Sequence, residues 1–168
     1  MKARPKDLTA DRRRQPRGCP DHLIVAALWV AYQANLGTLL RTCDAVGACM
    51  AVPATPHYET ALARGDTPPR RPHIHWLHGS KSGWIERERE IGARIVAVEL
   101  ADDAVPLGAL DAARVRTVLL LGHEHNGVPD EVWPLLDQVV SIPMVGIGAS
   151  LNVAVAGSLV LYRLAGLA

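Results

Sequence analysis

The stretch "SIPMVGIGASLNVAVAGSLVLY", residues 141–162, decides the fold that this sequence predicts. No charged residue occurs between Gln138 and Tyr162, which leaves three interpretations: a membrane span, a glycine-rich nucleotide loop, or a buried segment that needs its central Ser-Leu-Asn. A membrane span is disfavoured because Pro143 and three glycines dilute the hydrophobicity, and because Asn152 would cost several kcal/mol if unpaired in lipid. A helix buried on most sides inside a protein explains the same composition.

The glycines of this stretch do not form a classical nucleotide loop. A dinucleotide-binding fingerprint needs G-x-G-x-x-G, but the spacing from Gly146 and Gly148 reaches Leu151 where the third glycine belongs. No acidic residue follows about 20 positions later, and no Gly-Lys-Ser/Thr is present for a Walker A loop. Two glycine loops remain, residues 122–127 and 143–149, whose backbones can approach a ligand closely.

The rest of the sequence alternates between apolar strands and helices. Buried strands are expected at residues 23–30, 48–52, 94–100, 116–122 and 139–142, and an exposed or edge strand at residues 73–79. Helices are expected at residues 35–46, 82–91, 129–136 and 150–164, the last with Ser150 as its N-cap. Residues 55–72 are interpreted as a surface excursion, and residues 101–110 as a loop with a turn of helix at best. The alternation indicates an α/β fold with a mostly parallel sheet flanked by helices.

Length and charge suggest one domain behind a basic arm. The 168 residues are enough for one core, and 49% hydrophobic and 21% charged residues are typical of a globular chain. The net charge of +1 is unevenly placed, because residues 1–20 hold seven Lys and Arg against two Asp. This segment is interpreted either as a solubilising tail or as a flexible arm for a polyanion such as RNA. We therefore expect an arm at residues 1–20 and a domain at residues 21–168.

The basic start precedes the apolar run "LIVAALWVAY", which raises the question of secretion. Asp21 and His22 interrupt the junction, however, and no A-x-A cleavage site follows cleanly. Cys19, Cys43 and Cys49 are odd in number and lack CxxC spacing, so neither a disulfide framework nor a zinc site is expected, and a reducing setting is the simplest inference. We expect a cytoplasmic protein that is not bound to a membrane.

Three histidines, His73, His75 and His78, lie close together in the sequence. No carboxylate or cysteine nearby completes a ligand set for a metal ion. We therefore expect an exposed strand here and no metal site.

Polar residues follow three of the predicted strands, where ligands bind in open α/β sheets. Asn35 and Arg41 begin a helix after the first strand, Glu124 lies in the loop after residues 116–122, and Ser150 and Asn152 follow the last strand. Taken alone, Asn35 is better explained as a helix cap and Arg41 as a surface residue than as functional groups, because Asn caps are common.

Taken together, these segments give the order N-x-G-x-x-x-R, G-x-E-x-x-G and I-P-M-x-G-x-x-x-S-L-N-V. This order resembles the three motifs of the SpoU (TrmH-like) RNA 2′-O-ribose methyltransferases in the SPOUT superfamily. The resemblance extends from about residue 21 to residue 164. Each motif is weak alone, but the ordered set is specific.

The resemblance implies an α/β domain whose C-terminal part is tied in a deep trefoil knot, an exception to the rule against threaded chains. It also implies a homodimer with the active site near the subunit interface, and S-adenosylmethionine as cofactor, with S-adenosylhomocysteine as product. Positions that match the family's cofactor loops are Gly122, Ile142 and Leu151, expected to bind through backbone groups, and Met144, Gly146 and Gly148, expected to shape the pocket.

The implied reaction is methyl transfer to a ribose 2′-hydroxyl, a poor nucleophile until its proton is removed or polarised. By resemblance, Arg41 orients or deprotonates that hydroxyl; a guanidinium has a reference pKa above about 12, so both roles stay open. Asn35 is expected to position the ribose or phosphate, and Glu124 to orient Asn152, the knot loop or Arg41. Ser150 and Asn152 are expected beside the methyl group and the substrate.

The sequence departs from the family at Gln33-Ala34, where Asn-Pro is frequent, and at Ala154, where serine is common. It also shows neither the N-terminal substrate domain nor the C-terminal extension of some members, so we expect RNA to be bound by the domain, a dimer groove and the arm. The RNA is tRNA or rRNA. Two alternatives remain, a non-catalytic RNA-binding or assembly factor and a base-modifying SPOUT methyltransferase.

Overall fold

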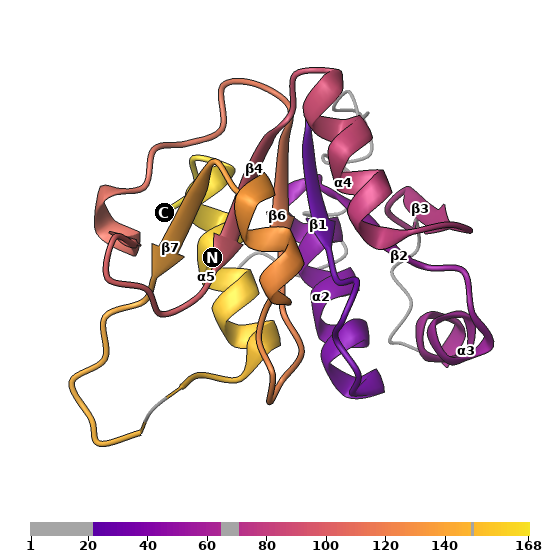
Figure 1. The fold of residues 1–168 in the computed structure, drawn as a ribbon. Helices are drawn as coiled ribbons and strands as arrows, with labels where there is room; N and C mark the ends of the chain where they lie inside the picture. Colours follow the sequence, from indigo (N-terminus) through magenta and orange to yellow (C-terminus); the bar gives the residue numbers. More distant parts are fainter. Residues whose placement is uncertain (1–21, 65–70, 149) are drawn as a thin grey trace, which may run out of the picture.

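The computed structural model describes residues 22–64, 71–148 and 150–168 (Figure 1). Within these residues seven strands form one sheet in the order β3-β2-β1-β6-β4-β7-β5, and every neighbouring pair is parallel. The strands are β1 (Leu23–Ala26), β2 (Cys49–Pro53), β3 (Ile74–Leu77), β4 (Arg94–Val98), β5 (Val105–Pro106), β6 (Thr117–Leu120) and β7 (Gln138–Ser141). The predicted parallel α/β fold is confirmed. Strands β1, β3, β4 and β6 are shorter than expected, and β2 and β7 have the expected length but are shifted by one residue.

Helices cover both faces of the sheet (Figure 1). One face packs against α2 (Gln33–Val46), α3 (Pro56–Arg64) and α5 (Val153–Leu164). The other packs against α4 (Lys81–Glu90) and the 3-10 helix η2 (Asp130–Leu135), while a second 3-10 turn, η1 (Leu107–Ala109), follows β5. Because the central strands are buried on both faces, they appear in the sequence as continuous apolar runs rather than as alternating patterns.

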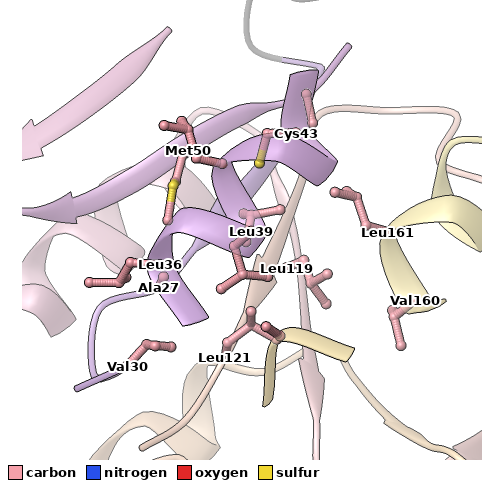
Figure 2. Close-up of a cluster of buried hydrophobic side chains, with 14 of the residues drawn as sticks. Ala27, Val30, Leu36, Leu39, Cys43, Met50, Leu119, Leu121, Val160 and Leu161 are labelled. Atoms are coloured by element: carbon pink, nitrogen blue, oxygen red, sulfur yellow. The ribbon is translucent and has the colours of Figure 1, made fainter. Parts of the chain in front are cut away.

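The larger of the two cores lies between the sheet and α2, α3 and α5 (Figure 2). Leu36, Leu39 and Cys43 of α2 enter it from one side, and Leu119 and Leu121 from β6 and the residue after it from the other. Leucine and valine fill this core with alanine in the tight places, because the sequence contains no phenylalanine.

Two segments differ from the sequence-based expectation. The surface excursion predicted at residues 55–72 contains the helix α3, which buries Tyr58, Ala61 and Leu62 at helical spacing. Pro56 suits the first turn of that helix, so the proline that suggested irregular structure is part of its start. The loop predicted at residues 101–110 contains the two-residue edge strand β5, which pairs with β7.

The uncharged segment, residues 138–162, ends in α5, which packs directly against α2. A Cβ at Gly157 would lie 2.7 Å from Leu121 Cδ1 and 3.1 Å from Leu39 Cδ2, so glycine lets the helix come this close without displacing these leucine side chains. The hydroxyls of Thr42 and Ser158 share a 2.8 Å hydrogen bond along the same seam. Close packing therefore explains the missing charge on the inward face of α5, whereas residues 143–148 are exposed and are not the buried segment that the sequence predicts.

The basic arm expected at residues 1–20 and Cys19 lie outside the described residues. No helix in the described part of the chain is both long and apolar enough to cross a membrane.

Candidate functional site

A cavity of about 260 Å³ opens where β4, β6 and β7 end and α5 begins. Its walls are mostly apolar. They include Val98 and Leu121 from the ends of β4 and β6, Val140 from β7, and Val153 and Ala156 from α5. The cavity thus occupies the carboxyl edge of a parallel sheet, where the fold class predicts ligand binding.

The turn from Gly122 to Val128 forms one rim of this cavity. His123 and Gly127 exchange two backbone hydrogen bonds of 2.9 Å, which close the turn tightly. A Cβ at Gly122 would overlap the backbone of Gly127 and Val128, so any other residue would force the turn open. Gly127 itself has φ +67°, a left-handed conformation that glycine adopts without strain.

Glu124, at the tip of this turn, accepts three hydrogen bonds from the start of α2. The donors are the backbone N–H groups of Ala31 and Tyr32 and the side-chain amide of Asn35, each at 2.9 Å. Burial alone would raise the pKa of Glu124, but these hydrogen bonds outweigh it and lower the pKa from 4.5 to about 2. The carboxylate is therefore ionised at neutral pH and lies at the positive end of α2.

Asn35 connects Glu124 to the third motif. Its side-chain oxygen accepts a 2.9 Å hydrogen bond from the side-chain amide of Asn152, while the Asn152 oxygen accepts from the backbone N–H groups of Ala154 and Val155 at 2.9 and 3.2 Å. The three predicted motifs thus meet in one continuous chain of hydrogen bonds, from Glu124 through Asn35 and Asn152 into α5.

The orientation of both asparagines in this chain is fixed by its ends. Glu124 can only accept as a carboxylate, and the N–H groups at the start of α5 can only donate. Flipping the amide of either Asn35 or Asn152 would set donor against donor or acceptor against acceptor. The network therefore has a single arrangement, which makes it a rigid brace between α2, the β6 turn and α5.

Two sequence-based assignments are corrected by this geometry. The N-cap of α5 is Asn152 and not Ser150, because Asn152 accepts from the helix N–H groups. Asn35 lies within the first turn of α2 and is not its cap; Tyr32 holds that position without a side-chain hydrogen bond. The amide of Asn35 is 6% exposed and turns inward to Glu124 instead.

The other predicted site residues divide between the cavity and the surface. The predicted residues that line the cavity are Gly122, Glu124, Ile142, Met144, Ser150 and Leu151. Gly146 and Gly148 do not line it, because the loop from β7 to α5 extends away from the sheet (Figure 1), with Val145 and Ile147 fully exposed.

Arg41 also lies outside the cavity lining. It follows Asn35 by six residues on α2, which places it about 9 Å further along the helix axis and on another side of the helix. Its side chain is exposed, whereas that of Asn35 is buried. The structure therefore brings together Asn35, Glu124, Ser150 and Asn152, but leaves Arg41 apart from them within one chain.

Sequence reasoning missed several cavity residues. Glu99 follows β4, lines the cavity and accepts a 2.8 Å hydrogen bond from Val128 N–H, which braces the turn from outside. His123 and His125 line the cavity beside Glu124. Glu99, His123 and His125 all follow the carboxyl ends of strands, where ligands bind in open α/β sheets, but none of them is a fixed residue of a sequence motif.

The described residues offer no group of three or more His, Cys, Asp or Glu side chains arranged to hold a metal ion. His73 and His75 of the predicted histidine segment pack edge to face, with ring centroids 4.6 Å apart.

The cavity suits a ligand with a flat apolar part and a few polar atoms. Its apolar walls can enclose a ring system, and the glycine at position 122 brings the backbone within reach, where a Cβ would otherwise fill the space. The polar side chains that line it are those of Glu99, His123, Glu124, His125 and Ser150. This composition matches what an adenosine-containing cofactor requires of its site.

The chain matches the model of the SpoU rRNA Methylase family over residues 22–162. It is 32% identical over 155 residues to the tRNA (guanosine(18)-2′-O)-methyltransferase of Escherichia coli K12, an alignment that covers 90% of this chain and 64% of the relative. The chain thus spans less than two thirds of that relative's length.

Solved structures show the same fold. The A. aeolicus TrmH/SpoU tRNA modifying enzyme superposes with a TM-score of 0.74 at 26% identity, covering 90% of this chain and 77% of that one. The AdoMet-bound rRNA methyltransferase of Sinorhizobium meliloti gives a TM-score of 0.73 at 24% identity, covering 96% and 69% of the two chains, a likeness of fold. The family match covers the sheet, the cavity and all three motifs, and the chain belongs to the SpoU rRNA Methylase family.

Proposed function

We propose that this protein transfers a methyl group from S-adenosylmethionine to a ribose 2′-hydroxyl of tRNA or rRNA. The observation that carries the proposal is the hydrogen-bond chain Glu124–Asn35–Asn152, which joins the three family motifs at the edge of the cavity. Family membership and a relative named as a tRNA 2′-O-methyltransferase support the reaction class. The family's name points to rRNA and the relative's to tRNA, so both substrates stay within the proposal.

The cavity is the proposed cofactor site. Ile142, Met144 and Leu151 would enclose the adenosine, with Gly122 providing close backbone approach. When bound, S-adenosylmethionine supplies an electrophilic methyl group, which leaves a neutral thioether once the methyl has been transferred. The cavity volume of about 260 Å³ lies slightly below the ~300–1,000 Å³ of typical ligand sites, so we expect further enclosure from the β7–α5 loop, including Gly146 and Gly148, or from a second chain.

Ser150 lines the cavity and is exposed, so in this proposal it brings a hydroxyl group to the reaction site. Asn35 and Asn152 act as positioning residues, because their side-chain oxygens are already committed to each other and to α5. Glu124 holds this pair and the start of α2 in place, and through them the position of Ser150 at the start of α5. In the proposed reaction the 2′-oxygen gains the methyl group, the sulfonium becomes a neutral thioether, and the 2′-proton passes to solvent water or, where Arg41 acts as the base, to its neutral guanidine.

Arg41 would act at the cavity of a partner subunit in a homodimer. Val155, Leu159 and Tyr162 form an exposed stripe on α5, at 47%, 43% and 38% exposure, spaced by about one helical turn. The Thr42–Ser158 hydrogen bond joins α2 to α5 at the residues that follow Arg41 and precede Leu159 in the sequence. A second copy of the chain covering the stripe would place Arg41 at the interface, where it would orient or deprotonate the hydroxyl bound at the partner's cavity.

The C-terminal trefoil knot is also part of the proposal. It is supported by the fold shared with SpoU enzymes and by α5, which returns from the exposed β7–α5 loop to pack against α2, β1 and β4. Pulling the chain from both ends with optical tweezers tests it, because a knotted chain stretches to a shorter contour length than its residue count allows. A full-length extension contradicts the knot.

We propose that the protein is cytoplasmic. We also propose that residues 1–20, outside the catalytic domain, bind RNA phosphates without recognising the base sequence. Deleting residues 1–17 would then weaken RNA binding at low and moderate salt and leave cofactor binding unchanged.

The reaction is tested by incubating the protein with radiolabelled S-adenosylmethionine and separate tRNA and rRNA pools. We expect label in one pool, lost in Arg41→Ala, while calorimetry shows that S-adenosylhomocysteine still binds this variant. No label in either pool, from a protein that binds S-adenosylhomocysteine, contradicts the proposal.

A further inference from the structure

Three rings lie in a row beside the cavity, namely those of Tyr32 at the N-cap of α2 and of His125 and His123 in the turn after β6. The ring centroids of Tyr32 and His125 are 6.0 Å apart at an interplanar angle of 86°, and those of His125 and His123 are 5.8 Å apart at 47°. Both histidines line the cavity, and the Tyr32 side chain beside them is 53% exposed. Core packing does not explain an exposed row of rings at the mouth of a ligand cavity.

Tyr32 is held at both ends. Its backbone N–H donates to Glu124 at 2.9 Å, and its hydroxyl shares a 2.8 Å hydrogen bond with His125 Nε2. The backbone N–H of His125 in turn donates to His123 Nδ1 at 3.1 Å, which orders the second ring. An exposed ring that is already fixed loses little conformational entropy when a ligand covers it.

We propose that the Tyr32 ring, braced edge-on by His125, forms a stacking platform for an unpaired nucleobase of the RNA substrate. Every nucleobase has a π-face, and proteins bind single-stranded RNA by stacking its bases on aromatic and histidine rings. The carboxylate of Glu124 anchors Tyr32 and also holds Asn35, so the platform and the proposed catalytic brace form one rigid unit. The inference rests on the proposed function and identifies how the target strand is held.

The surface next to Tyr32 has the chemistry that single-stranded RNA requires. His57 Nε2 donates to the Ala31 carbonyl at 2.7 Å, which places another ring beside the platform. The ammonium group of Lys81 lies 5.4 Å from the centre of the Trp29 ring, further along the carboxyl edge of the sheet. Rings interleaved with a cation suit bases and phosphates, whereas an apolar protein partner would need a continuous hydrophobic patch.

The test uses a five-nucleotide single-stranded RNA with 2-aminopurine at its centre and uridine on either side. Fluorescence of 2-aminopurine falls when the base stacks, so titrating the S-adenosylhomocysteine-bound protein into the RNA gives both quenching and Kd. We expect quenching by the native chain and by Tyr32→Phe, which keeps the ring. Tyr32→Leu should lose the quenching and raise Kd roughly 5- to 150-fold, the contribution of one stacked base.

The matched control is Trp76→Leu, which removes an exposed aromatic ring, 37% accessible, from the edge strand β3. It should behave as the native chain. Tyr32→Leu keeps the backbone contact to Glu124, and its side chain makes no cap hydrogen bond with α2, so its affinity for S-adenosylhomocysteine should not change. No quenching by the native chain, unchanged quenching by Tyr32→Leu, or equal losses in the Tyr32 and Trp76 variants would overturn the platform.

Failure of the platform and failure of the proposed function give different results. If the native chain methylates RNA and Tyr32→Leu has the same RNA KM, the platform is wrong and the reaction stands. If the native chain transfers no methyl group but quenches 2-aminopurine through Tyr32, the platform stands and the reaction is wrong.

Discussion

The side-chain amide of Asn152 donates a 2.9 Å hydrogen bond to the side-chain oxygen of Asn35, across 117 positions of sequence. The side-chain amide of Asn35 also donates to the carboxylate of Glu124, and the side-chain oxygen of Asn152 also accepts from the N-terminus of α5. This pair therefore connects the helix after β1, the turn after β6 and the helix after β7, which carry the three motifs of the family. A substitution at either asparagine should therefore alter the position or stability of both α2 and α5.

Asn35→Ala and Asn152→Ala should each destabilise the fold. Asn152→Ala removes the cap of α5, which contributes about 1 kcal/mol. Asn35→Ala removes one of the three hydrogen bonds that Glu124 accepts, a bond to a charged group that contributes about 1.5–3 kcal/mol. Because the two residues are in contact, the double variant should lose less than the sum of the single losses. Urea denaturation measures this, with Thr38→Ala on the exposed side of α2 as control; strictly additive losses would show that the pair is not coupled.

Glu124→Gln should destabilise the chain. The two carboxylate oxygens accept hydrogen bonds from the N–H groups of Ala31 and Tyr32, and the amide nitrogen of glutamine would replace one of these acceptors with a donor. The loss should depend on pH. Since the folded-state pKa of Glu124 is lowered from 4.5 to about 2, its contribution to stability is full above about pH 4.5 and disappears as the pH falls towards 2. The difference in unfolding free energy between the native chain and Glu124→Gln should therefore shrink from pH 6 to pH 3. A constant or growing difference would contradict the assigned role.

Gly122→Ala should disrupt the cavity rim. The added methyl group overlaps the backbone of Gly127 and Val128, which cannot move as a side chain can, so we expect a loss of about 1–3 kcal/mol. Binding of S-adenosylhomocysteine, measured by calorimetry, should weaken at the same time. Gly79→Ala is the control, because nothing lies within 4 Å of its added Cβ. A Gly122→Ala variant with native Tm and affinity would rule out the close approach.

Leu159→Asp should break the proposed homodimer, because it places a charge in the middle of the exposed stripe on α5. Sedimentation equilibrium should give twice the chain mass for the native protein and the chain mass for the variant. Ile91→Asp, which alters a residue 66% exposed after α4, should remain dimeric. A native protein that sediments as a monomer at micromolar concentration would contradict the interface.

Much of the fold could be predicted from the sequence because the central strands are buried on both faces and appear as uninterrupted apolar runs. The helix α3 could not be predicted, because its short apolar pattern of Tyr58, Ala61 and Leu62 lies among Pro, Gly and Arg residues that are typical of a loop. Local sequence also predicted Ser150 as the cap of α5. Asn152 takes that role because Asn35, remote in sequence, orients its amide, a tertiary effect that no local rule contains.

Tyr32 and Glu99 illustrate the same limit within the site. Neither belongs to a motif, and each matters through a partner far along the chain, His125 for Tyr32 and the Val128 N–H for Glu99. The motif residues were found because their types and order are specific. Their division into an assembled group and a separate Arg41 emerged only from the folded chain.

The central claim, methylation of a ribose hydroxyl, is tested most directly by alkaline hydrolysis of RNA labelled by this protein. Hydrolysis of the RNA backbone uses the 2′-hydroxyl as its nucleophile, so a methylated ribose protects the phosphodiester on its 3′ side. We predict that the label is recovered in alkali-resistant dinucleotides, and that Arg41→Ala yields none. Label recovered in mononucleotides, with the methyl group on the base, would contradict the account.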